Sequence, residues 1–455
     1  MTLSGKARKN LSYVDPAEFT PHFAWCRTPR SAAREVVCEA VPLQKIAAKF
    51  GTPTYVYSES AITDAFEELN TGLADLPHLL CFAVKANGNL SILKHLANLG
   101  SGFDIVSGGE LEHLGHIAVP GKRIVFSGVG KTREEIRSAL TYRAKRSALP
   151  GILQFNIESP AELELLLEEA ARRKTTGGAV PGVSIRVNPD VAAGGHPHIS
   201  TGLAHHKFGV SWRNARSLYL QERNSPYIRW QGISAHIGSQ IVDLAPFRQA
   251  LSRLASYVLD LREQGVALRH LDFGGGLGVR YTTESPVNRV DYARMIARTV
   301  KPLGIRLLLE PGRSIVASSA ALLARVLFTK DNSTKSFVVL DAAMNDFTRP
   351  VLYDAPHPIT AVRKPARARR NSSKRYDVVG PVCESGDTFL FDWPLGNVQP
   401  GDVVAIWGAG AYGMVQASNY NGRRRPAEVL VKGKLARLIR RRETHADVLR
   451  SDVLA

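Results

Sequence analysis

Three short stretches of this sequence carry residues whose types and spacing could perform chemistry together. Lys85 ends the apolar run "CFAVK", which begins at Cys81. Three consecutive glycines occur in "LDFGGGLG", and "LEPGR" supplies Glu310 and Arg313. Lysine amines bond covalently to carbonyl compounds, glycine turns direct backbone N–H groups at phosphates, and a carboxylate keeps a proton on a pyridine nitrogen. Together the stretches favour a ligand that carries both a phosphate and a carbonyl group.

Each stretch also has a purely structural explanation. A lysine at a strand end can lie along apolar surface with its ammonium group in water, a glycine-rich turn can simply bend the chain, and Glu310 can pair with Arg313. The glycines do not match the dinucleotide-binding pattern, because Val279 stands where that pattern needs a small residue. The hypothesis of pyridoxal phosphate held as a Schiff base therefore depends on whether the fold brings the stretches together.

Eight short β-type runs alternate with segments of helical periodicity. The runs occupy residues 79–86, 102–109, 123–130, 152–159, 182–189, 232–239, 271–276 and 306–313. Segments between them, such as "PAELELLLEEAARR", repeat apolar residues at intervals of three and four. Eight such alternations predict a (β/α)8 TIM barrel of the α/β class rather than a doubly wound sheet.

The carboxyl ends of the strands of such a barrel meet on one face, where active sites lie. The ends of the eight runs carry chemically active or conformationally special residues, namely Lys85, Asp104, Ser107, Arg186, His236, Ser239, Gly274–Gly276, Glu310 and Arg313. The predicted fold therefore directs the three stretches to one shared site.

The rest of the sequence predicts a second domain rich in β-structure. After residue 318, runs such as "KSFVVLDAA" and "DVVAIWGAG" are joined by proline, glycine and charged turns. "TPTYVYS" (52–58) could be a further strand of that domain. We expect an N-terminal segment over 1–58 that partly contributes to the β-domain, a cofactor-binding barrel over 59–318, and a C-terminal all-β domain over 319–455.

Composition limits the classes of protein that fit. The 455 residues are 44% hydrophobic and 22% charged, and there is no apolar signal or membrane-length apolar run, so we expect a soluble cytoplasmic protein without a membrane partner. The cysteines lack zinc-like spacing and favour free thiols; they are Cys26, Cys38, Cys81 and Cys383. The net charge is +18, but the basic runs, including 361–375, lack interleaved aromatic residues, which argues against a nucleic-acid partner.

Nine motifs occur in an order that resembles one enzyme family. They are "CFAVKAN", "GFDIVSGGEL", "HISTGL…KFG", "HIGSQI", "DFGGGLG", "LEPGRSIVA", "MNDFTRPVLYDAPHP", "VGPVCESGDTF" and "GAGAYG". Together they resemble the diaminopimelate decarboxylases, pyridoxal-phosphate enzymes with an alanine racemase-like barrel (fold type III), from about residue 50 to the C-terminus. The resemblance implies decarboxylation of meso-2,6-diaminopimelate, an amino-acid substrate, to L-lysine and CO₂ in lysine biosynthesis.

The resemblance also implies roles around pyridoxal phosphate. Lys85 would carry the cofactor as a Schiff base, His236 would stack on its ring, and Glu310 would face the ring nitrogen. The other cofactor-binding residues would be Asp104, Ser239, Gly274, Gly275, Gly276, Pro311, Gly312, Arg313 and Tyr412. Cys383 would be the general acid that returns a proton after CO₂ leaves, although a lone cysteine is otherwise read as a buried structural thiol.

Substrate choice is expected to depend on the groups that bind the distal carboxylate and the distal amine. The resemblance places Arg313, Arg349, Tyr353, Glu384 and Tyr412 at the substrate. Arginine can bind a carboxylate through two hydrogen bonds, so Arg313 and Arg349, with Tyr353, are the candidates for the carboxylate, and Glu384 is the candidate for the amine. Ornithine decarboxylases resemble "CDS" where this chain has "CES", and they lack the arginine of "MNDFTRP".

Two alternatives stay open on these residues. One is a related decarboxylase that acts on ornithine, arginine or a carboxylated polyamine, and the other is a non-catalytic regulatory homologue. Intact Lys85, Glu310 and Cys383 argue against the second. The resemblance further implies a homodimer with shared active sites, in which Cys383, Glu384 and Tyr412 reach across the two-fold axis.

No metal site is expected. Four histidines gather in "GGHPHISTGLAHHKFG", namely His196, His198, His205 and His206. They have no nearby cysteine, and Asp190 is the one close carboxylate, so the segment is interpreted as a substrate-covering connection after the fifth strand.

Overall fold

The structure of the protein is a computed structural model that describes residues 20–27, 33–144, 150–175, 178–191, 207–364 and 374–454. The chain divides into two compact units. The barrel unit comprises Ala65–Gly278 and Pro286–Ser314, and the β-unit comprises Met1–Asp64, Val279–Ser285 and Ile315–Ala455. The β-unit therefore draws on three separate stretches of sequence.

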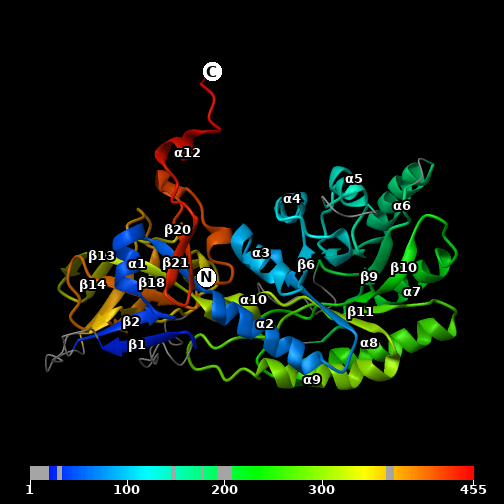
Figure 1. Cartoon of the computed structure of the whole chain (residues 1–455), viewed down its shortest axis with the longest axis horizontal. Coiled ribbons are helices and arrows are strands. Elements are labelled where there is room, and N and C mark those ends of the chain that lie inside the picture. Colours follow the sequence, from blue (N-terminus) through cyan, green and yellow to red (C-terminus); the bar gives the residue numbers. More distant parts are fainter. Residues whose placement is uncertain are drawn as a thin grey trace. The chain divides into compact units, whose positions relative to one another are not determined.

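The barrel unit is built on a closed barrel of eight parallel strands (Figure 1). The strands are β5 (His78–Ala83), β6 (Gly102–Ile105), β7 (Ile124–Phe126), β8 (Gln154–Ile157), β9 (Gly182–Arg186), β10 (Arg229–Ser234), β11 (His270–Asp272) and β12 (Arg306–Leu309). They pair in chain order, and β12 closes the barrel on β5 through Leu307 opposite His78. The predicted (β/α)8 barrel is confirmed.

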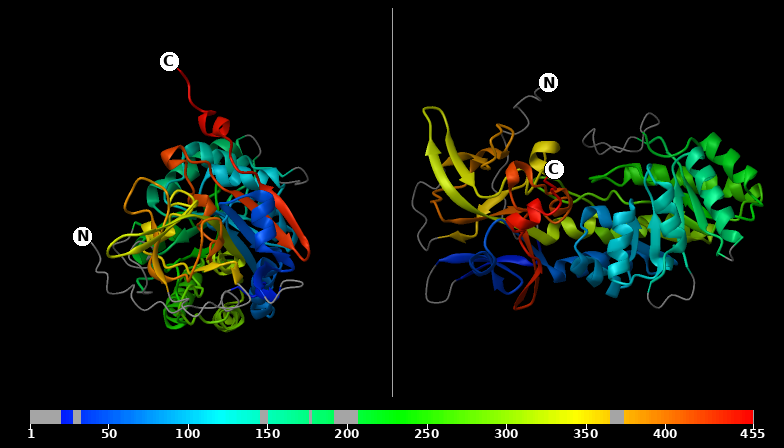
Figure 2. Two further views of the ribbon diagram at one scale, coloured as in Figure 1. Left: turned by 90° about the vertical axis from the view of Figure 1, so that its left-hand side faces the viewer. Right: turned by 90° about the horizontal axis from the view of Figure 1, so that it is seen from above.

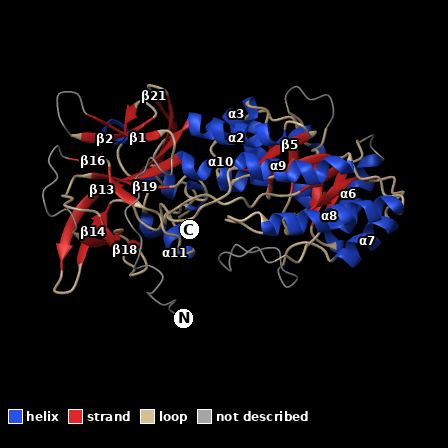
Figure 3. Ribbon diagram, turned by 90° about the horizontal axis from the view of Figure 1, so that it is seen from below, coloured by secondary structure: helices blue, strands red, loops and turns tan. Residues whose placement is uncertain are grey.

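A helix follows every barrel strand, and the helices surround the strands (Figure 3). They are α3 (Leu90–Asn98), α4 (Gly108–His116), α5 (Arg133–Thr141), α6 (Pro160–Lys174), α7 (Trp212–Gln221), α8 (Ala245–Glu263), α9 (Arg289–Val300) and the short α10 (Arg313–Val316), while α2 (Glu59–Leu73) precedes β5. Helix α6 illustrates the local rules, since Ser159 caps its first turn, Pro160 begins it, and Leu163 and Leu166 are buried. No helix within the described ranges combines the length and apolar character needed to cross a membrane.

The barrel interior is partly apolar and partly polar, and Gln154 and His270 are buried polar residues at the starts of β8 and β11. Leu79, Cys81, Val125 and Leu308 form a buried apolar cluster. Nearer the carboxyl ends lie buried polar side chains, namely Asp104, Ser127, Asn156, Asp272 and Glu310. Barrels of this type are usually filled by branched apolar residues, and burying polar groups costs free energy unless they are hydrogen-bonded. The polar layer therefore marks the carboxyl end as the end adapted to chemistry.

The β-unit contains two sheets. The small sheet has β1 (Phe23–Arg27), β2 (Arg34–Cys38), β3 (Val41–Pro42) and β16 (Arg363–Lys364). The nine-stranded sheet has β18 (Thr388–Pro394), β17 (Arg375–Val379), β14 (Ser336–Leu340), β13 (Ala320–Asp331), β4 (Thr54–Ser58), β20 (Ala427–Lys432) and β21 (Leu435–Arg440) in that order. In addition, β19 (Val403–Trp407) pairs with β13, and β15 (Ile359–Ala361) pairs with β19. The long β13–β14 hairpin is the yellow pair of ribbons in the right-hand view of Figure 2.

The β-unit is a mixed sheet domain rather than purely β. It also contains α1 (Leu43–Phe50), α11 (Arg349–Leu352) and α12 (His445–Leu449). The stretch 52–58 supplies β4, which pairs antiparallel with β13 and parallel with β20. Phe23 packs edge-on against Trp407 at 5.3 Å between ring centroids, so the small sheet and the large sheet share one apolar core.

A buried carboxyl group fixes the segment that leads into α11. Asp346 is 1% exposed, and its Oδ2 accepts a hydrogen bond from the backbone N–H of Ala343 at 2.9 Å. Its backbone carbonyl accepts the Tyr55 hydroxyl of β4 at 2.6 Å. Burial raises the pKa of Asp346 to about 7, although the Ala343 N–H and the charge of Arg423 oppose the rise.

This raised pKa makes stability pH-dependent in a defined direction. The folded state holds the Asp346 proton up to about pH 7, whereas an unfolded aspartate releases it near pH 4, so this contribution is complete below about pH 4 and is lost as pH rises towards 7. We expect Asp346→Asn to flatten the fall in unfolding free energy over this window, which one group can steepen by up to about 1.4 kcal/mol per pH unit. Urea midpoints measured from pH 4.5 to 8 test this, with the exposed Asp452→Asn as control. Parallel pH profiles for wild type and Asp346→Asn would contradict it.

Candidate active site

The site at the carboxyl end of the barrel begins with Lys85. Strand β5 ends at Ala83, and Lys85 lies in the following 3₁₀ turn, η2 (Val84–Ala86), rather than in the strand as the sequence suggests. The backbone N–H of Ala83 donates to the carbonyl of Pro311 at 3.1 Å, which ties the end of β5 to the segment after β12. The turn presents the Lys85 side chain at the barrel mouth, with 39% of it exposed.

Lys85 pairs with a buried carboxylate. Its Nζ donates to Oδ2 of Asp104 at 2.9 Å, and Asp104 is fully buried on β6. The other oxygen, Oδ1 of Asp104, is buried and has no hydrogen-bond partner among the described residues. An unsatisfied buried carboxylate oxygen costs free energy, so it is suited to receive a donor from a bound ligand.

His236 follows β10 and is held as a neutral ring. Its Nδ1 accepts the backbone N–H of Gly275 at 3.2 Å, which requires a lone pair on that nitrogen. Desolvation lowers the pKa of His236 well below its ordinary value, and the positive charges of Arg186 and Lys85 lower it further. A neutral, fixed imidazole can stack on an aromatic ring without adding charge to it.

The glycine run packs too closely for any side chain. A Cβ atom on Gly274 would lie 2.7 Å from the carbonyl oxygen of Ala235, and one on Gly275 would lie 2.3 Å from the carbonyl oxygen of Glu310. Gly274 and Gly276 also have φ values of 64° and 110°, which favour glycine. The run therefore forms a backbone surface next to the ends of β10 and β12.

Arg313 and Ser239 lie together beside this surface. The Nε and Nη2 atoms of Arg313 donate to the Ser239 hydroxyl oxygen at 3.2 and 3.0 Å. Arg313 is 5% exposed, and Pro311 and Gly312 before it are buried. The N–H groups of Gly274 and Gly275 already donate to Asp272 and His236, so the guanidinium and the hydroxyl are the donors suited to an oxyanion here.

Glu310 forms a coupled pair with Asp272 in the polar layer. The two carboxyl groups are hydrogen-bonded to each other, and Asn156 Nδ2 donates to Asp272 at 2.9 Å and to Glu310 at 3.4 Å. Burial raises the pKa of Glu310 well above its ordinary value, and the charges of Asp104 and Asp272 add to the rise. Burial raises the pKa of Asp272 as well, so both carboxyl groups of the pair favour the protonated form more than exposed ones do.

Sequence reasoning assigned no role to three residues of this layer. Asp272 and Asn156 stand two positions after His270 and Gln154, and such alternation of polar residues signals inward-facing positions on a barrel strand. Glu110, in the first turn of α4, accepts the N–H of Val106 at 2.7 Å. Burial raises the pKa of Glu110 to about 7, and the charge of Asp104 contributes to the rise.

The remaining candidate residues belong to the β-unit. Cys383 and Glu384 are both exposed and follow β17. The hydroxyl of Tyr420 is hydrogen-bonded to Glu384, and this bond raises the pKa of Tyr420. Tyr412 is half-buried, with a φ of 54° that places its backbone in the left-handed region. The thiol, the carboxylate and the phenol groups thus lie on loops of the same unit.

Arg349 and Tyr353 lie at the two ends of α11. Arg349 is 5% exposed, and its guanidinium carbon is 5.8 Å from the centroid of the Tyr353 ring. Gln416 Nε2 approaches the Tyr353 hydroxyl at 3.4 Å. A buried guanidinium against aromatic rings keeps a fixed orientation, as a carboxylate-binding group requires.

The histidines expected in the covering connection, His196, His198, His205 and His206, lie outside the described residues. Within the ranges that the structure does describe, no group of three or more histidine, cysteine or acidic side chains could hold a metal ion. The free cysteines there are two buried thiols, Cys38 and Cys81, and two exposed thiols, Cys26 and Cys383.

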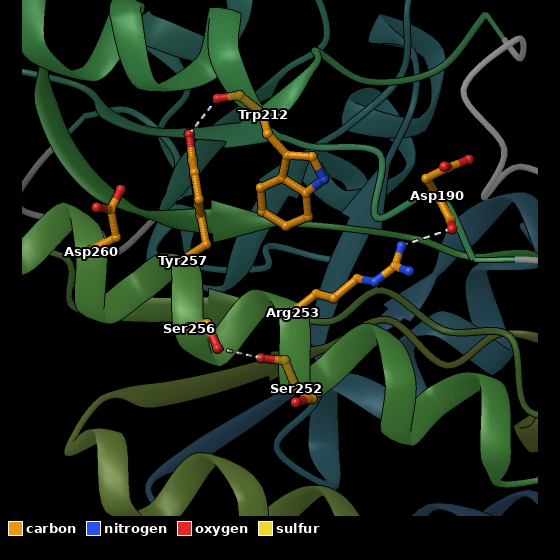
Figure 4. A pocket seen from close by; sticks show the side chains of 7 residues that line it. All are labelled: Asp190, Trp212, Ser252, Arg253, Ser256, Tyr257 and Asp260. Atoms are coloured by element: carbon orange, nitrogen blue, oxygen red, sulfur yellow. Dashed lines mark hydrogen bonds between the residues drawn. The ribbon is translucent and has the colours of Figure 1, made fainter.

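A pocket of about 580 Å³ elsewhere in the barrel unit contains none of the candidate residues (Figure 4). It is lined by Asp190, Trp212, Ser252, Arg253, Ser256, Tyr257 and Asp260. Arg253 donates to the carbonyls of Pro189 and Asp190 at 2.5 and 2.8 Å, and the Tyr257 hydroxyl donates to the Trp212 carbonyl at 2.7 Å. These hydrogen bonds attach two segments to α8, namely Pro189–Asp190 and the first residue of α7, Trp212. We therefore interpret the pocket as a feature of helix packing.

The barrel mouth fits pyridoxal phosphate by three independent features. Lys85 offers an amine beside a buried Asp104 oxygen that has no described partner. Ser239 and Arg313 offer donors to a phosphate beside the glycine run, where no Cβ atom would fit. Glu310 is a buried carboxyl group with a raised pKa, which suits a partner for a pyridine nitrogen.

Comparison with known proteins agrees with this chemistry. The family described as "Pyridoxal-dependent decarboxylase, pyridoxal binding domain" matches residues 59–317. The diaminopimelate decarboxylase of Neisseria meningitidis serogroup A is 47% identical over 407 residues, which cover 90% of this chain and 96% of that protein. The enzyme of the same name from Pseudomonas aeruginosa is 47% identical over 410 residues, covering 90% and 95%.

A solved structure matches the whole architecture. The crystal structure of Helicobacter pylori diaminopimelate decarboxylase complexed with L-lysine has a TM-score of 0.83 and 41% identity, and the match covers 90% of this chain and 98% of that one. The likeness thus extends through both units and is not confined to the barrel. With its barrel matched by the pyridoxal-binding family and nine-tenths of its length aligned to such enzymes, the chain belongs to the diaminopimelate decarboxylases, a branch of the pyridoxal-dependent decarboxylases.

Proposed function

We propose that this protein decarboxylates meso-2,6-diaminopimelate to L-lysine and CO₂ at the carboxyl end of its barrel. Membership of the family supports the reaction, and the observation that carries the site assignment is the Lys85 amine at 2.9 Å from buried Asp104. When bound, pyridoxal phosphate supplies the electron sink that stabilises the charge left on the α-carbon as CO₂ departs. The residues described above bind, orient and transfer protons around that chemistry.

Lys85 is proposed as the lysine that holds the cofactor, and Asp104 as the group that orients its amine. Since Asp104 is fully buried, its charge keeps the Lys85 amine directed into the mouth rather than towards solvent. The ring of His236 is proposed to cover one face of the cofactor. Ser239, with Arg313 behind it, and the closely packed backbone of Gly274–Gly276 are proposed to hold the phosphate.

Glu310 is proposed to hold the proton at the pyridine nitrogen. Its partnership with Asp272 matters because two adjacent buried carboxyl groups cannot both be ionised cheaply. Glu310 would hold the pyridine nitrogen of the bound cofactor, and the positive charge of a protonated ring would offset the repulsion between the two carboxyl groups. The polar layer thus favours the protonated ring, which withdraws electrons best.

Cys383 is proposed to return a proton to the α-carbon of the substrate. Thiols give up protons more readily than alcohols do, which suits a general acid near neutral pH. Arg349, Tyr353, Arg313 and Tyr412 are proposed to surround the distal part of the substrate. Glu384 is proposed to bind the distal amine.

We further propose that the active protein is a cytoplasmic homodimer with shared sites. Lys85 belongs to the barrel unit, whereas Cys383, Glu384 and Tyr412 belong to the β-unit. In a two-fold dimer, each chain can contribute its β-unit residues to the barrel of the other, which generates two equal sites from reciprocal halves.

Substrate specificity gives a direct test. Purified protein with pyridoxal phosphate should release CO₂ and form L-lysine from meso-diaminopimelate, and it should leave L-ornithine and L-arginine unreacted. Glu384→Ala should lower kcat/KM for meso-diaminopimelate at least about thirtyfold, because truncating one member of a charge pair that the bound substrate would desolvate is costly. Cofactor absorbance should be unchanged in that variant. The neighbouring Ser385→Ala is the matched control and should behave as wild type.

The outcomes separate the assignments. Turnover of ornithine or arginine at rates equal to those of meso-diaminopimelate would reject the substrate. Unchanged meso-diaminopimelate kinetics in Glu384→Ala would reject Glu384 as the amine-binding residue while leaving the reaction intact.

A further inference from the structure

A buried histidine in the β-unit contacts the guanidinium of Arg349. His357 is 1% exposed and lies between α11 and β15. Its Nδ1 lies 2.8 Å from the carbonyl oxygen of Trp407, and its Nε2 lies 3.2 Å from Nε of Arg349. His357 occurs in the motif "YDAPHP", yet none of the functions assigned above includes it.

These two contacts fix the proton on the ring. A carbonyl oxygen can only accept, so Nδ1 of His357 must carry the proton and donate to Trp407. The Nε of Arg349 can only donate, so Nε2 of His357 must present its lone pair. The ring is therefore the neutral tautomer with its hydrogen on Nδ1.

The position of Trp407 makes this arrangement rigid. Trp407 ends β19 in the nine-stranded sheet, and its N–H donates to the carbonyl of Pro358 at 2.9 Å. Its indole Nε1 donates to the Thr360 hydroxyl at 3.0 Å. The Trp407 carbonyl that accepts from His357 therefore belongs to a strand residue held by several hydrogen bonds. This carbonyl keeps the imidazole in one orientation.

Aromatic rings complete the enclosure of His357 and Arg349. The His357 ring lies edge-on to Tyr281 and Phe347, at 4.9 and 4.6 Å between centroids. The Arg349 guanidinium carbon lies 5.2 Å from the Tyr281 centroid. Gly408 leaves room for this packing, because a Cβ atom there would lie 3.0 Å from the Tyr281 ring.

A neutral acceptor affects Arg349 differently from a carboxylate. A carboxylate in the place of His357 would orient the guanidinium but would also neutralise much of its charge. The neutral imidazole engages Nε and leaves the positive charge uncompensated by this contact. Because His357 engages Nε, a carboxylate that binds Arg349 through two parallel hydrogen bonds has to use the two Nη atoms.

We infer that His357 is a positioning residue that holds the Arg349 guanidinium for a substrate bearing a distal carboxylate. The inference rests on the proposed role of Arg349 in binding that carboxylate. His357 itself does not touch the substrate and acts through Arg349. The substrate class that this pair selects is a diamino acid with a second carboxylate at the end remote from the reacting carbon.

Two inhibitors isolate this contribution. When one carboxylate leaves meso-diaminopimelate, the surviving carboxylate of L-lysine is the distal one. Cadaverine has the same chain and both amines but no carboxylate. The ratio of the inhibition constants of cadaverine and L-lysine against meso-diaminopimelate turnover therefore measures how well the distal carboxylate is bound.

Three substitutions separate the two contacts of His357. His357→Gln can keep an acceptor near Arg349, His357→Asn can keep a donor near Trp407, and His357→Phe keeps only the packing. We expect the Asn and Phe variants to weaken L-lysine inhibition about tenfold, the cost of losing one orienting hydrogen bond to a charged group. Cadaverine inhibition should not change, and the Gln variant should recover most of the loss. The exposed His445→Phe serves as the control.

Arg349→Gln tests the assumption beneath the inference. It should weaken L-lysine inhibition more than any His357 variant does, and adding His357→Phe to it should have no further effect, because His357 acts only through Arg349. If Arg349→Gln leaves the inhibitor ratio unchanged, the proposed role of Arg349 is wrong. If Arg349→Gln lowers the ratio but the Asn and Phe variants of His357 leave it unchanged, or weaken both inhibitors equally, the positioning role of His357 is wrong.

Thermal melting of each variant identifies any variant that has not folded. If His357→Phe does not fold, His357→Asn decides the result.

Discussion

Lys85→Ala should abolish the reaction and the covalent attachment of pyridoxal phosphate. We expect activity to fall about a thousandfold or more, as for the loss of a covalent catalytic group. The expectation comes from the position of the amine, 2.9 Å from a fully buried Asp104 and 39% exposed at the barrel mouth. In the wild type, borohydride reduction followed by peptide mapping should place the pyridoxyl group on Lys85.

Lys85→Arg separates charge from covalent chemistry. Arginine can preserve the ion pair with Asp104, and hence the local fold, but it cannot form the covalent link. This variant should be as inactive as Lys85→Ala while melting at the wild-type temperature. Lys94→Ala, on the barrel helix α3, is the matched control and should retain both label and activity. A pyridoxyl label on any other lysine of the wild type would overturn the assignment.

Mixing two inactive variants should restore activity if the sites are shared. Cys383→Ala is expected to be nearly inactive because it lacks the proposed proton donor. A dimer of one Lys85→Ala chain and one Cys383→Ala chain would contain one site with both residues intact and one with neither. Random reassortment makes about half of the dimers mixed, so activity should recover to about a quarter of wild type.

The mixing experiment needs proof that subunits exchange. Differently tagged Lys85→Ala and Cys383→Ala chains should therefore be co-purified through both tags, which selects mixed dimers and raises the expected activity to about half of wild type. Mixed dimers that remain as inactive as their parents would show that each chain completes its own site. Such a result would contradict the proposal that Cys383 acts in the active site of the other chain. It would not affect the assignment of Lys85.

The barrel residues could be predicted because strand ends follow simple rules. Lys85 and Glu310 stand at or just after the end of an apolar run, Asp104 is the third of the four residues of β6, and the carboxyl ends of parallel strands must meet on one face. The number and order of the strands followed from the alternation of two periodicities. The exact end of β5 did not, because the 3₁₀ turn at Val84–Ala86 continues the apolar run without a proline or glycine to mark the change.

Residues whose role depends on a neighbour from another strand were harder to predict. The coupling of Asp272 and Glu310 exists because β11 and β12 are adjacent, and no local sequence pattern predicts that two carboxyl groups will interact. Likewise, the stretch Val279–Ser285 belongs to the β-unit although it lies between two barrel strands in sequence. Cys383 could be selected only by family resemblance, since a single cysteine on a loop has no periodic or spacing signal.

The place of β4 in the large sheet constrains how the chain folds as it leaves the ribosome. β4 ends at Ser58 and lies between β13 and β20 in the sheet. It can pair with β20, its second neighbour, only after Lys432 has been synthesised. At a synthesis rate of ~10 residues per second, that wait is roughly half a minute. All eight barrel strands, from His78 to Leu309, are synthesised during this interval. The barrel can therefore close first, while the apolar "TYVYS" edge remains available to chaperones or to wrong partners until the last strands emerge.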